Sequence, residues 1–291
     1  MMTSDRMIST YFETGTLQDL PRDHFIDGAF VAADSGNRME SFDAGTGEAF
    51  SDFAAGTAAD VDRAVTSAAK GFEVWRNTPP ARRCAILNEA ARLMRAEVDR
   101  IAVVESLDSG KTLAEAQGDV VGSARLFEYY AGAADKIHGE TIPYQVEYFV
   151  SVIREPRGVT GHIIPWNYPA QMFGRTLAPA LATGNAAVLK PAEEACLSCL
   201  KLTELADEAG FPAGVLNVVT GYGATAGAAL AEHPDLDFIS FTGSPEVGTL
   251  VQIASAKHHR ACVLELGGKS PQIIFSDADF AAALPIVVAG I

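Results

Sequence analysis

The chain has 291 residues, of which 48% are hydrophobic and 20% are charged, a composition typical of a globular protein. Its formal net charge of −15 argues against a nucleic-acid partner and against docking on an anionic membrane, because both require a basic surface. The N-terminus lacks the apolar core of a signal peptide, and the longest apolar runs are too short to span a bilayer. Four cysteines are too few for a disulfide framework in a chain this long, so we expect a cytoplasmic protein. We expect no metal site.

The first half of the chain is predicted to be mainly helical. Apolar residues recur at helical spacing over 58–75, over 81–104 and over about 113–134. Pro79 and Pro80 separate the first two of these segments, since proline interrupts a helix. Before the first helix, residues 1–20 are expected to form an N-terminal tail.

A two-stranded excursion is predicted at 138–156. Residues 147–153 alternate and are rich in β-branched and aromatic side chains, which is typical of a strand. Residues 141–145 are expected to pair with them across a turn. Two strands alone are marginal in water and leave edges that pair with other chains.

From Gly158 onward, short apolar runs alternate with helical segments. The expected strands are 159–164, 186–189, 215–219, 238–241, 262–264 and 272–275. The expected helices are 197–209, 225–231, 245–256 and 277–291. This alternation predicts an α/β fold with a Rossmann-like, doubly wound parallel sheet and flanking helices, which binds ligands at the carboxyl ends of its strands.

The first segment that suggests chemistry is Ile163 to Pro169, where a strand ends and Asn167 lies between two prolines. Proline restricts the backbone on both sides of Asn167 and would hold its side-chain amide in one place. A fixed amide is suited to stabilising a developing oxyanion. The alternative is a rigid turn in which asparagine is simply a turn former.

The second segment is Lys190-Pro191-Ala192-Glu193, directly after a predicted strand. A lysine at a strand's carboxyl end lies where a nucleotide binds, and Glu193 is placed to accept from both hydroxyls of an adenosine ribose. The alternative is an exposed charge pair at the start of a helix.

The third segment is 238–248, where a strand leads into Gly243, Ser244 and Pro245. Glycine allows a ligand to approach the backbone, and serine and proline are preferred at the start of a helix. The free amides of that helix would suit a pyrophosphate, although an ordinary capped helix has the same residues. The preceding Gly221 to Gly227 resembles a dinucleotide fingerprint with one residue too many, which is weak evidence.

The fourth segment is Leu264 to Pro271, in which Glu265 lies between two leucines and is followed by two glycines. Apolar neighbours are expected to desolvate the carboxylate and raise its pKa toward the working range of a general base. A lone glutamate in such a position is more often paired or merely exposed.

Together, these four segments resemble the aldehyde dehydrogenase superfamily in order and spacing, over nearly the whole chain and most closely from Glu155 to Asp279. Leu264 to Pro271 is similar to the family's glutamate signature. The resemblance implies that Asn167 donates to the oxyanion, that Glu265 activates water, and that Lys190 and Glu193 hold the adenosine ribose. It implies that Ser244 and the helix after it hold the pyrophosphate. The cofactor cleft would also be lined by Ile163, Ile164, Pro165, Trp166, Gly223, Gly227, Phe241, Thr242, Gly243, Val247 and Leu266.

The resemblance further implies that a cysteine thiolate attacks the aldehyde, that hydride passes to the nicotinamide, and that a thioester is hydrolysed to a carboxylic acid. In the family this nucleophile follows the signature glutamate by a few tens of residues, so we expect the chain to stop before it. Cys84 and Cys262 lie in an expected helix and strand. Cys196 and Cys199 form a C-x-x-C at a helix start, a spacing that can lower a thiol pKa, but partners for a redox or metal role are not visible.

The resemblance also implies a domain organisation. Residues 21–137 and 157–267 would form the cofactor-binding domain, 138–156 an oligomerisation hairpin, and 268–291 the beginning of a catalytic domain. We expect NAD rather than NADP, because Glu193 would repel a 2′-phosphate, and we expect a homo-oligomer, a dimer or a tetramer, for a full-length form. Two hypotheses remain: a fragment of a dehydrogenase whose aldehyde is not identified, or a non-catalytic cofactor-binding or interaction protein.

Overall fold

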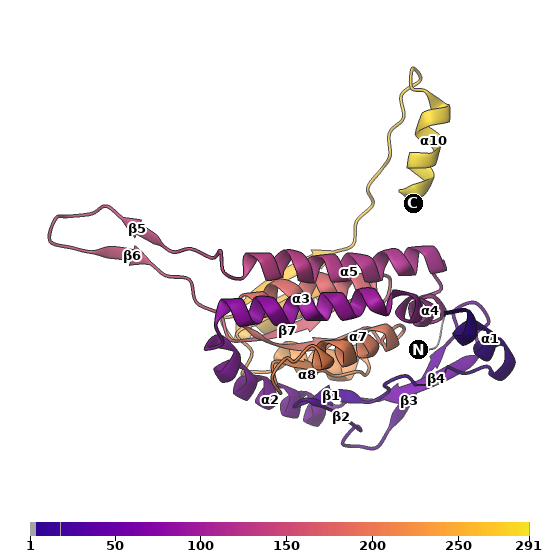
Figure 1. Ribbon diagram of the computed structural model, residues 1–291, viewed down its shortest axis with the longest axis horizontal. Coiled ribbons are helices and arrows are strands. Elements are labelled where there is room, and N and C mark those ends of the chain that lie inside the picture. The colour runs from indigo at the N-terminus through magenta and orange to yellow at the C-terminus, as the bar shows by residue number, and fades with distance from the viewer. Residues whose placement is uncertain (1–3, 18, 291) are drawn as a thin grey trace.

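The computed structural model describes residues 4–17 and 19–290, and its main feature is a seven-stranded sheet with helices on both faces (Figure 1). The predicted α/β class is therefore confirmed. The helices are α1 (Ser4–Thr14), α2 (Ala58–Arg76), α3 (Pro80–Ala96), α4 (Val98–Ser109), α5 (Leu113–Ala133), α6 (Pro169–Ala182), α7 (Leu197–Glu208), α8 (Ala228–Glu232), α9 (Pro245–Lys257) and α10 (Phe280–Ala289). The strands are β1 (His24–Ile26), β2 (Ala29–Val31), β3 (Arg38–Phe42), β4 (Ala49–Ala54), β5 (Glu140–Ile142), β6 (Val150–Val152), β7 (Val159–Ile163), β8 (Ala186–Lys190), β9 (Leu216–Val218), β10 (Phe238–Gly243) and β11 (Ala261–Leu266).

The order of the strands creates a crevice at the centre of the sheet. The order is β11-β10-β7-β8-β9-β1-β2; β7 to β11 run parallel to one another, and β1 is antiparallel to both β9 and β2. The chain moves outward from β7 to β8 and β9, and then returns to the other side of β7. In open α/β sheets, ligands bind outside the carboxyl ends of the strands at such a reversal.

Both faces of the central strands are buried, as β8 illustrates. Its Ala187 and Leu189 belong to the core formed with α3, α5, α6 and α7, whereas Ala186 and Val188 belong to the core formed with α2. Successive side chains of a strand point to opposite faces of the sheet, so a strand covered on both sides is a continuous apolar run. This is why short apolar runs located these strands in the sequence.

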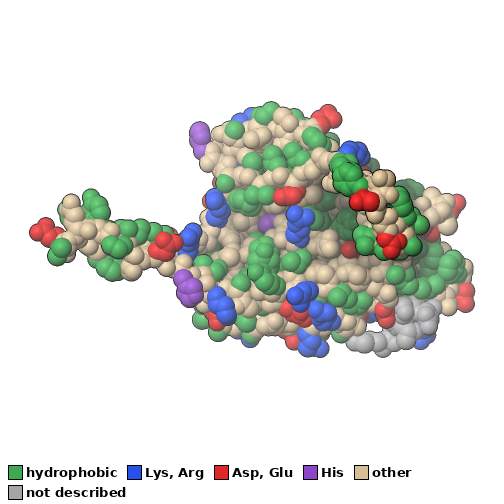
Figure 2. Space-filling view, turned by 90° about the horizontal axis from the view of Figure 1, so that it is seen from above, with side chains coloured by type: hydrophobic (Ala, Val, Ile, Leu, Met, Phe, Trp, Pro, Cys, Tyr) green, Lys and Arg blue, Asp and Glu red, His purple; other side chains and the backbone are tan. Residues whose placement is uncertain are grey.

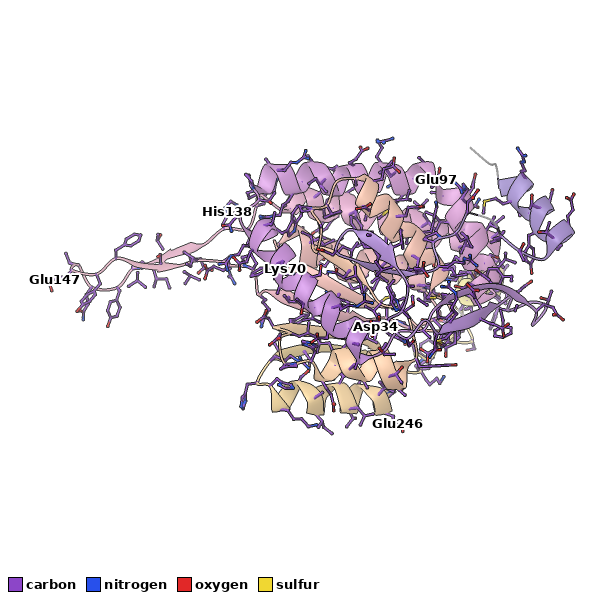
Figure 3. The ribbon with its side chains drawn as sticks, turned by 90° about the horizontal axis from the view of Figure 1, so that it is seen from below. Asp34, Lys70, Glu97, His138, Glu147 and Glu246 are labelled. Atoms are coloured by element: carbon purple, nitrogen blue, oxygen red, sulfur yellow. The ribbon has the colours of Figure 1, made fainter. Side chains whose placement is uncertain are left out.

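The predicted two-stranded excursion projects from the body as a hairpin (Figures 1 and 3). Thr141 of β5 lies opposite Ser151 of β6 in an antiparallel pair, which confirms the predicted pairing, although each strand has only 3 residues. His138 lies at the base of the hairpin and Glu147 near its tip (Figure 3). Apolar side chains cover much of its surface (Figure 2), and Phe149 is 84% exposed.

The prediction of a single helix over 81–104 is wrong. The segment forms α3 and α4, which are separated at Glu97, a residue with non-helical backbone angles. Neither glycine nor proline marks this break. The packing changes after the break, because α4 buries the consecutive residues 101–105 and is therefore covered on several sides, whereas α3 buries one face.

Three other expectations also need correction. Residues 272–275 form no strand: Ile273 and Phe275 are exposed, and no neighbouring strand receives their backbone hydrogen bonds within the described chain. Within the expected N-terminal tail, the described residues form a helix, α1, which buries Met7 and Tyr11. The helix predicted at 225–231 begins with a π-helical turn, Gly223–Gly227, before α8.

The C-terminal helix predicted at 277–291 is shorter, and Ile291 lies outside the described residues. The observed helix is α10, whose first turn is capped by the Asp279 side chain, and it lies away from the sheet (Figure 1). Leu284 and Ile286 on it are exposed. Over the described residues, no helix combines the length and the apolar character needed to cross a membrane.

The close packing of α2 on the loop before β9 gives a test of the fold. A Cβ at Gly71 would lie 2.3 Å from the carbonyl carbon of Gly214, whereas a Cβ at Gly118 in α5 would meet nothing within 4 Å. We therefore expect Gly71→Ala to lower the free energy of unfolding by about 1–3 kcal/mol, the usual cost of overpacking. The matched change Gly118→Ala should raise it by up to about 1 kcal/mol through helix propensity. Urea unfolding of both variants measures the difference, and equal effects would contradict the packing described.

Candidate functional site

A cavity of about 1170 Å³ opens at the carboxyl ends of β7, β8 and β10. Every residue predicted for the site lines it, although these residues come from five separate segments of the chain. They are Ile163, Ile164, Pro165, Trp166, Asn167, Lys190, Glu193, Gly223, Gly227, Phe241, Thr242, Gly243, Ser244, Val247, Glu265 and Leu266. The structure thus brings the predicted residues together, while their roles stay predictions.

The Asn167 loop connects β7 to α6. Ile164 anchors its start because the side chain is 3% exposed in the main core, and Pro169 is the first residue of α6. Between these fixed points Asn167 is exposed at the cavity, and its neighbour Trp166 is 55% exposed. The loop therefore presents its polar and aromatic side chains to the cavity from a rigid base.

Lys190 and Glu193 form an ion pair at the end of β8. Lys190 is 2% exposed, and its Nζ lies 2.6 Å from a Glu193 carboxylate oxygen. Glu193 also accepts a hydrogen bond from the Gly223 amide at 3.0 Å. Burial alone would raise the pKa of Glu193, but the bonds from Lys190 and Gly223 outweigh it and hold this pKa below its usual value. Glu193 is therefore an ionised carboxylate at the wall of the cavity.

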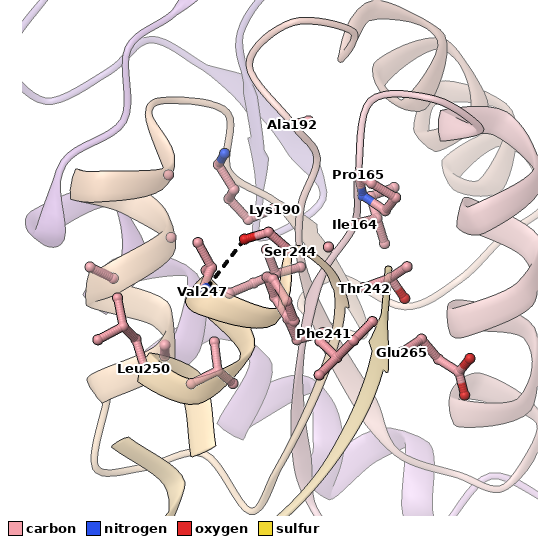
Figure 4. A pocket seen from close by; sticks show the side chains of 18 of the residues that line it. Ile164, Pro165, Lys190, Ala192, Phe241, Thr242, Ser244, Val247, Leu250 and Glu265 are labelled. Atoms are coloured by element: carbon pink, nitrogen blue, oxygen red, sulfur yellow. Dashed lines mark hydrogen bonds between the residues drawn. The ribbon is translucent and has the colours of Figure 1, made fainter. Parts of the chain in front are cut away.

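Helix α9 begins at the cavity as the sequence predicts. Ser244 is the N-cap and accepts a hydrogen bond from the Val247 amide at 3.2 Å, and Pro245 occupies the first turn (Figure 4). A Cβ on Gly243 would lie 2.6 Å from the Phe241 ring, so a larger residue here would require the buried ring to shift. The backbone at the start of α9 therefore remains accessible.

The prediction that apolar flanks desolvate Glu265 is wrong. Its side chain is 55% exposed, and an oxygen lies 3.5 Å from a guanidinium nitrogen of Arg175 in α6. In a strand, residues i−1 and i+1 point to the opposite face from residue i. Leu264 packs toward the core with α9, so the two leucines cannot cover the carboxylate, which lies on the other side of β11 (Figure 4).

The sequence interpretation missed part of the cavity wall. Arg175 carried no signal, because its link to Glu265 appears only once α6 lies beside β11. One stripe of α9 was detectable, since Val247, Leu250, Val251 and Ala254 have the spacing of a helix face. The other missed lining residues are Ala192, Glu194, Ala224, Ala228, Ala231, Glu232, Pro245, Ile253, Lys257 and Gly267.

None of the four cysteines lines this cavity. Cys196 and Cys199 are buried at the start of α7, and burial is the main factor that raises the pKa of both thiols well above the usual value. This is the opposite of the lowered pKa that a reactive C-x-x-C would have. No group of three or more histidine, cysteine or acidic side chains suited to a metal occurs among the described residues.

Comparison with known proteins identifies the family. The model of the aldehyde dehydrogenase family matches residues 30–291. The chain belongs to the aldehyde dehydrogenase family. It is 45% identical over 266 residues to hydroxyisobutyraldehyde dehydrogenase of Mycolicibacterium austroafricanum, covering 91% of this chain and 53% of the relative. It is 47% identical to the mitochondrial benzaldehyde dehydrogenase of Antirrhinum majus, covering 90% of this chain and 50% of the relative.

A solved structure agrees with the fold. A betaine aldehyde dehydrogenase variant from Staphylococcus aureus, in complex with NAD+, superimposes with a TM-score of 0.91 at 35% identity. The superposition covers 94% of this chain and 56% of that one. The chain thus spans about half the length of the curated relatives it matches.

The burial of the cysteines gives a direct test. In the native chain at pH 8, we expect a disulfide reagent such as Ellman's reagent to modify the half-buried Cys84 and Cys262 but not Cys196 or Cys199. Peptide mass spectrometry identifies the modified thiols. As a control, all four should react in guanidinium chloride. Rapid modification of Cys196 or Cys199 in the folded chain would contradict their placement.

Proposed function

We propose that this chain forms the cofactor-binding part of an enzyme that oxidises an aldehyde to a carboxylic acid, with NAD as the hydride acceptor. One observation carries the proposal: a single cavity at the reversal of the sheet joins Asn167, Glu193, Glu265 and the start of α9. Family membership supports the same reaction, and NAD+ is the ligand in the solved relative from Staphylococcus aureus.

The cavity fits a dinucleotide in size and in chemistry. Ligand cavities commonly measure about 300–1,000 Å³, so one of about 1170 Å³ suits a large ligand. The first amides of α9 lack partners within the helix and would hold a pyrophosphate. Space is left at Gly223 and Gly227, where an added Cβ would come no closer than 3.8 Å to a neighbouring group.

The ionised Glu193 favours NAD over NADP. A carboxylate accepts hydrogen bonds from a free ribose hydroxyl and repels a 2′-phosphate. Lys190 offsets part of this repulsion, because it is paired with the same carboxylate at 2.6 Å. The expected result is a preference for NAD.

This preference can be measured by calorimetric titration of the chain with both cofactors. We expect tighter binding of NAD, and we expect Glu193→Gln to reduce the ratio of the two affinities by at least roughly tenfold, because like charges at close range are costly. Lys201 and Glu204 form a pair with the same spacing in α7, outside the cavity. Glu204→Gln is therefore the matched control and should leave the ratio unchanged. Tighter binding of NADP by the unmodified chain would contradict the assignment.

The cavity's own side chains supply two parts of the reaction. When bound, NAD would accept the hydride that leaves the aldehyde carbon. Asn167 would donate its side-chain amide to the substrate oxygen as negative charge develops there. Glu265 would accept a proton from the water that releases the acid.

A second candidate function is cofactor binding without catalysis by this chain. It is favoured by one observation, namely that the cavity has no cysteine in its wall. Without a thiol, Asn167 and Glu265 have no covalent adduct on which to act, so they would give at most residual catalysis.

The lack of a cysteine among the described residues that line the cavity predicts the outcome of a simple assay. We expect residues 1–291 to bind NAD but to give no steady production of NADH with any of several aldehydes, measured by absorbance. Cys262→Ser and Cys84→Ser serve as controls for the two half-buried thiols. Steady NADH production that one of these changes abolishes would show that the nucleophile is a cysteine placed outside the cavity in this structure.

The proposal extends to assembly, domains and location. The exposed hairpin β5–β6 is suited to joining copies of the chain as a homo-oligomer, since its edges and Phe149 are uncovered. We keep the division into a cofactor-binding domain (21–137 and 157–267), the hairpin (138–156) and the start of a catalytic domain (268–291). Four free thiols fit a reducing compartment such as the cytoplasm, although one relative is a mitochondrial protein.

A further inference from the structure

Three buried charged residues lie beneath the Asn167 loop, outside the cavity. Glu105 of α4 is 0% exposed, and Asp119 of α5 and Lys111 are nearly buried. The Lys111 ammonium lies 3.0 Å from a Glu105 oxygen and also donates to Asp119. Burying charged groups is costly unless all of them are paired, so the loss of any one of these three side chains would leave an unpaired buried charge.

The cluster replaces a missing helix cap. Helix α6 begins at Pro169, two residues after Asn167. Its N-cap residue, Tyr168, makes no capping bond with its side chain, and its first turn has no acidic residue. Instead, the Ala170 amide donates to Glu105 at 3.1 Å, although the two residues are 65 positions apart. The Glu105 carboxylate of α4 thus accepts from an amide in the first turn of α6 for which the neighbouring residues provide no acceptor.

A second contact reaches the loop itself. The Lys111 Nζ lies 4.5 Å from the centre of the Tyr168 ring, a cation–π distance. Tyr168 is the residue next to Asn167. The same ammonium therefore links the carboxylate that caps α6 to the aromatic ring at the end of the loop.

We infer that Glu105 and Lys111 are positioning residues for Asn167, holding its loop through the Ala170 amide and the Tyr168 ring. Neither residue lines the cavity, so both act through the loop. The functional part of this inference rests on the proposed role of Asn167. The two prolines restrict the loop along the chain, and the buried cluster fixes it to the body from below.

The two tryptophans allow a test that needs no activity. Trp166 lies in the loop, and Trp75 is 0% exposed in the core, so 5-fluorotryptophan labelling gives one ¹⁹F signal for each, assigned with Trp166→Phe. We expect Lys111→Met to shift, broaden or split the Trp166 signal and to leave the Trp75 signal in place. Lys111→Arg, which retains the cation, should restore the Trp166 signal. In Glu105→Gln, exchange of the Ala170 amide with solvent should be roughly tenfold faster, because bonds to charged groups are worth about that factor.

Asp108 provides the matched control. It is a buried carboxylate on the same helix, one turn away, but it accepts from the Leu197 amide of α7 instead. Asp108→Asn should therefore leave the Trp166 signal unchanged. If Lys111→Met does not fold, the double change Glu105→Gln with Lys111→Met, which removes both charges of the pair, is used in its place. An unmoved Trp166 signal in the folded variant, an equal effect of Asp108→Asn, or no recovery in Lys111→Arg would each overturn the inference.

NAD titration of the same labelled chains separates the two proposals. If the unmodified chain does not bind NAD but Lys111→Met moves the Trp166 signal, the positioning stands and the proposed function fails. If NAD binds but the Trp166 signal does not respond to Lys111→Met, the positioning fails and the proposed function stands.

Discussion

The reversal of strand order between β7 and β10 is the constraint on which the site depends. Because β7 to β11 are parallel, the segments that follow β7, β8 and β10 all emerge at the same edge of the sheet. The reversal separates the connections on the two sides of β7 and leaves space between them. Asn167, Glu193 and Ser244 meet there although each belongs to a different strand–helix connection. The geometry of the site is thus a consequence of chain topology, and each motif supplies only the side chains.

The local electrostatics of the cavity differ from those of the whole chain. A net charge of −15 would disfavour an anionic ligand if the charge were spread evenly. The cavity wall is closer to balance: three cations, Lys190, Arg175 and Lys257, line it together with four glutamates, Glu193, Glu194, Glu232 and Glu265. Helix amides and a paired, nearly buried lysine act at short range, where distant surface carboxylates are screened by salt. For the proposed dinucleotide, the groups within a few ångströms of Glu193 therefore matter more than the net charge of the chain.

The sequence predicted those features that depend on neighbouring residues. Apolar runs located β7, β8 and β10, and the cap of α9 followed from Ser244 and Pro245. Features decided by distant contacts were missed. Strands β1 and β2 have only 3 residues each and exist because β9 offers an edge to pair with. The break at Glu97, the ion pair of Arg175 with Glu265, and the capping of α6 by Glu105 likewise join segments that no local pattern connects.

Glu265 lines the cavity as the sequence predicts, but its carboxylate is exposed to solvent and not desolvated as expected. The flanking leucines fix the strand, but alternation turns them to the face of α9 and leaves the carboxylate on the opposite face. Strand β11 is the outermost strand of the sheet, and within the described chain its outer edge has no partner. Water therefore reaches a side chain that is 55% exposed, and one of its oxygens lies 3.5 Å from a guanidinium nitrogen of Arg175. In the proposed function Glu265 accepts a proton, and desolvation of its charged form would strengthen it as a base. A surface that covered this edge of β11 would therefore act on the strand and on the proposed base together.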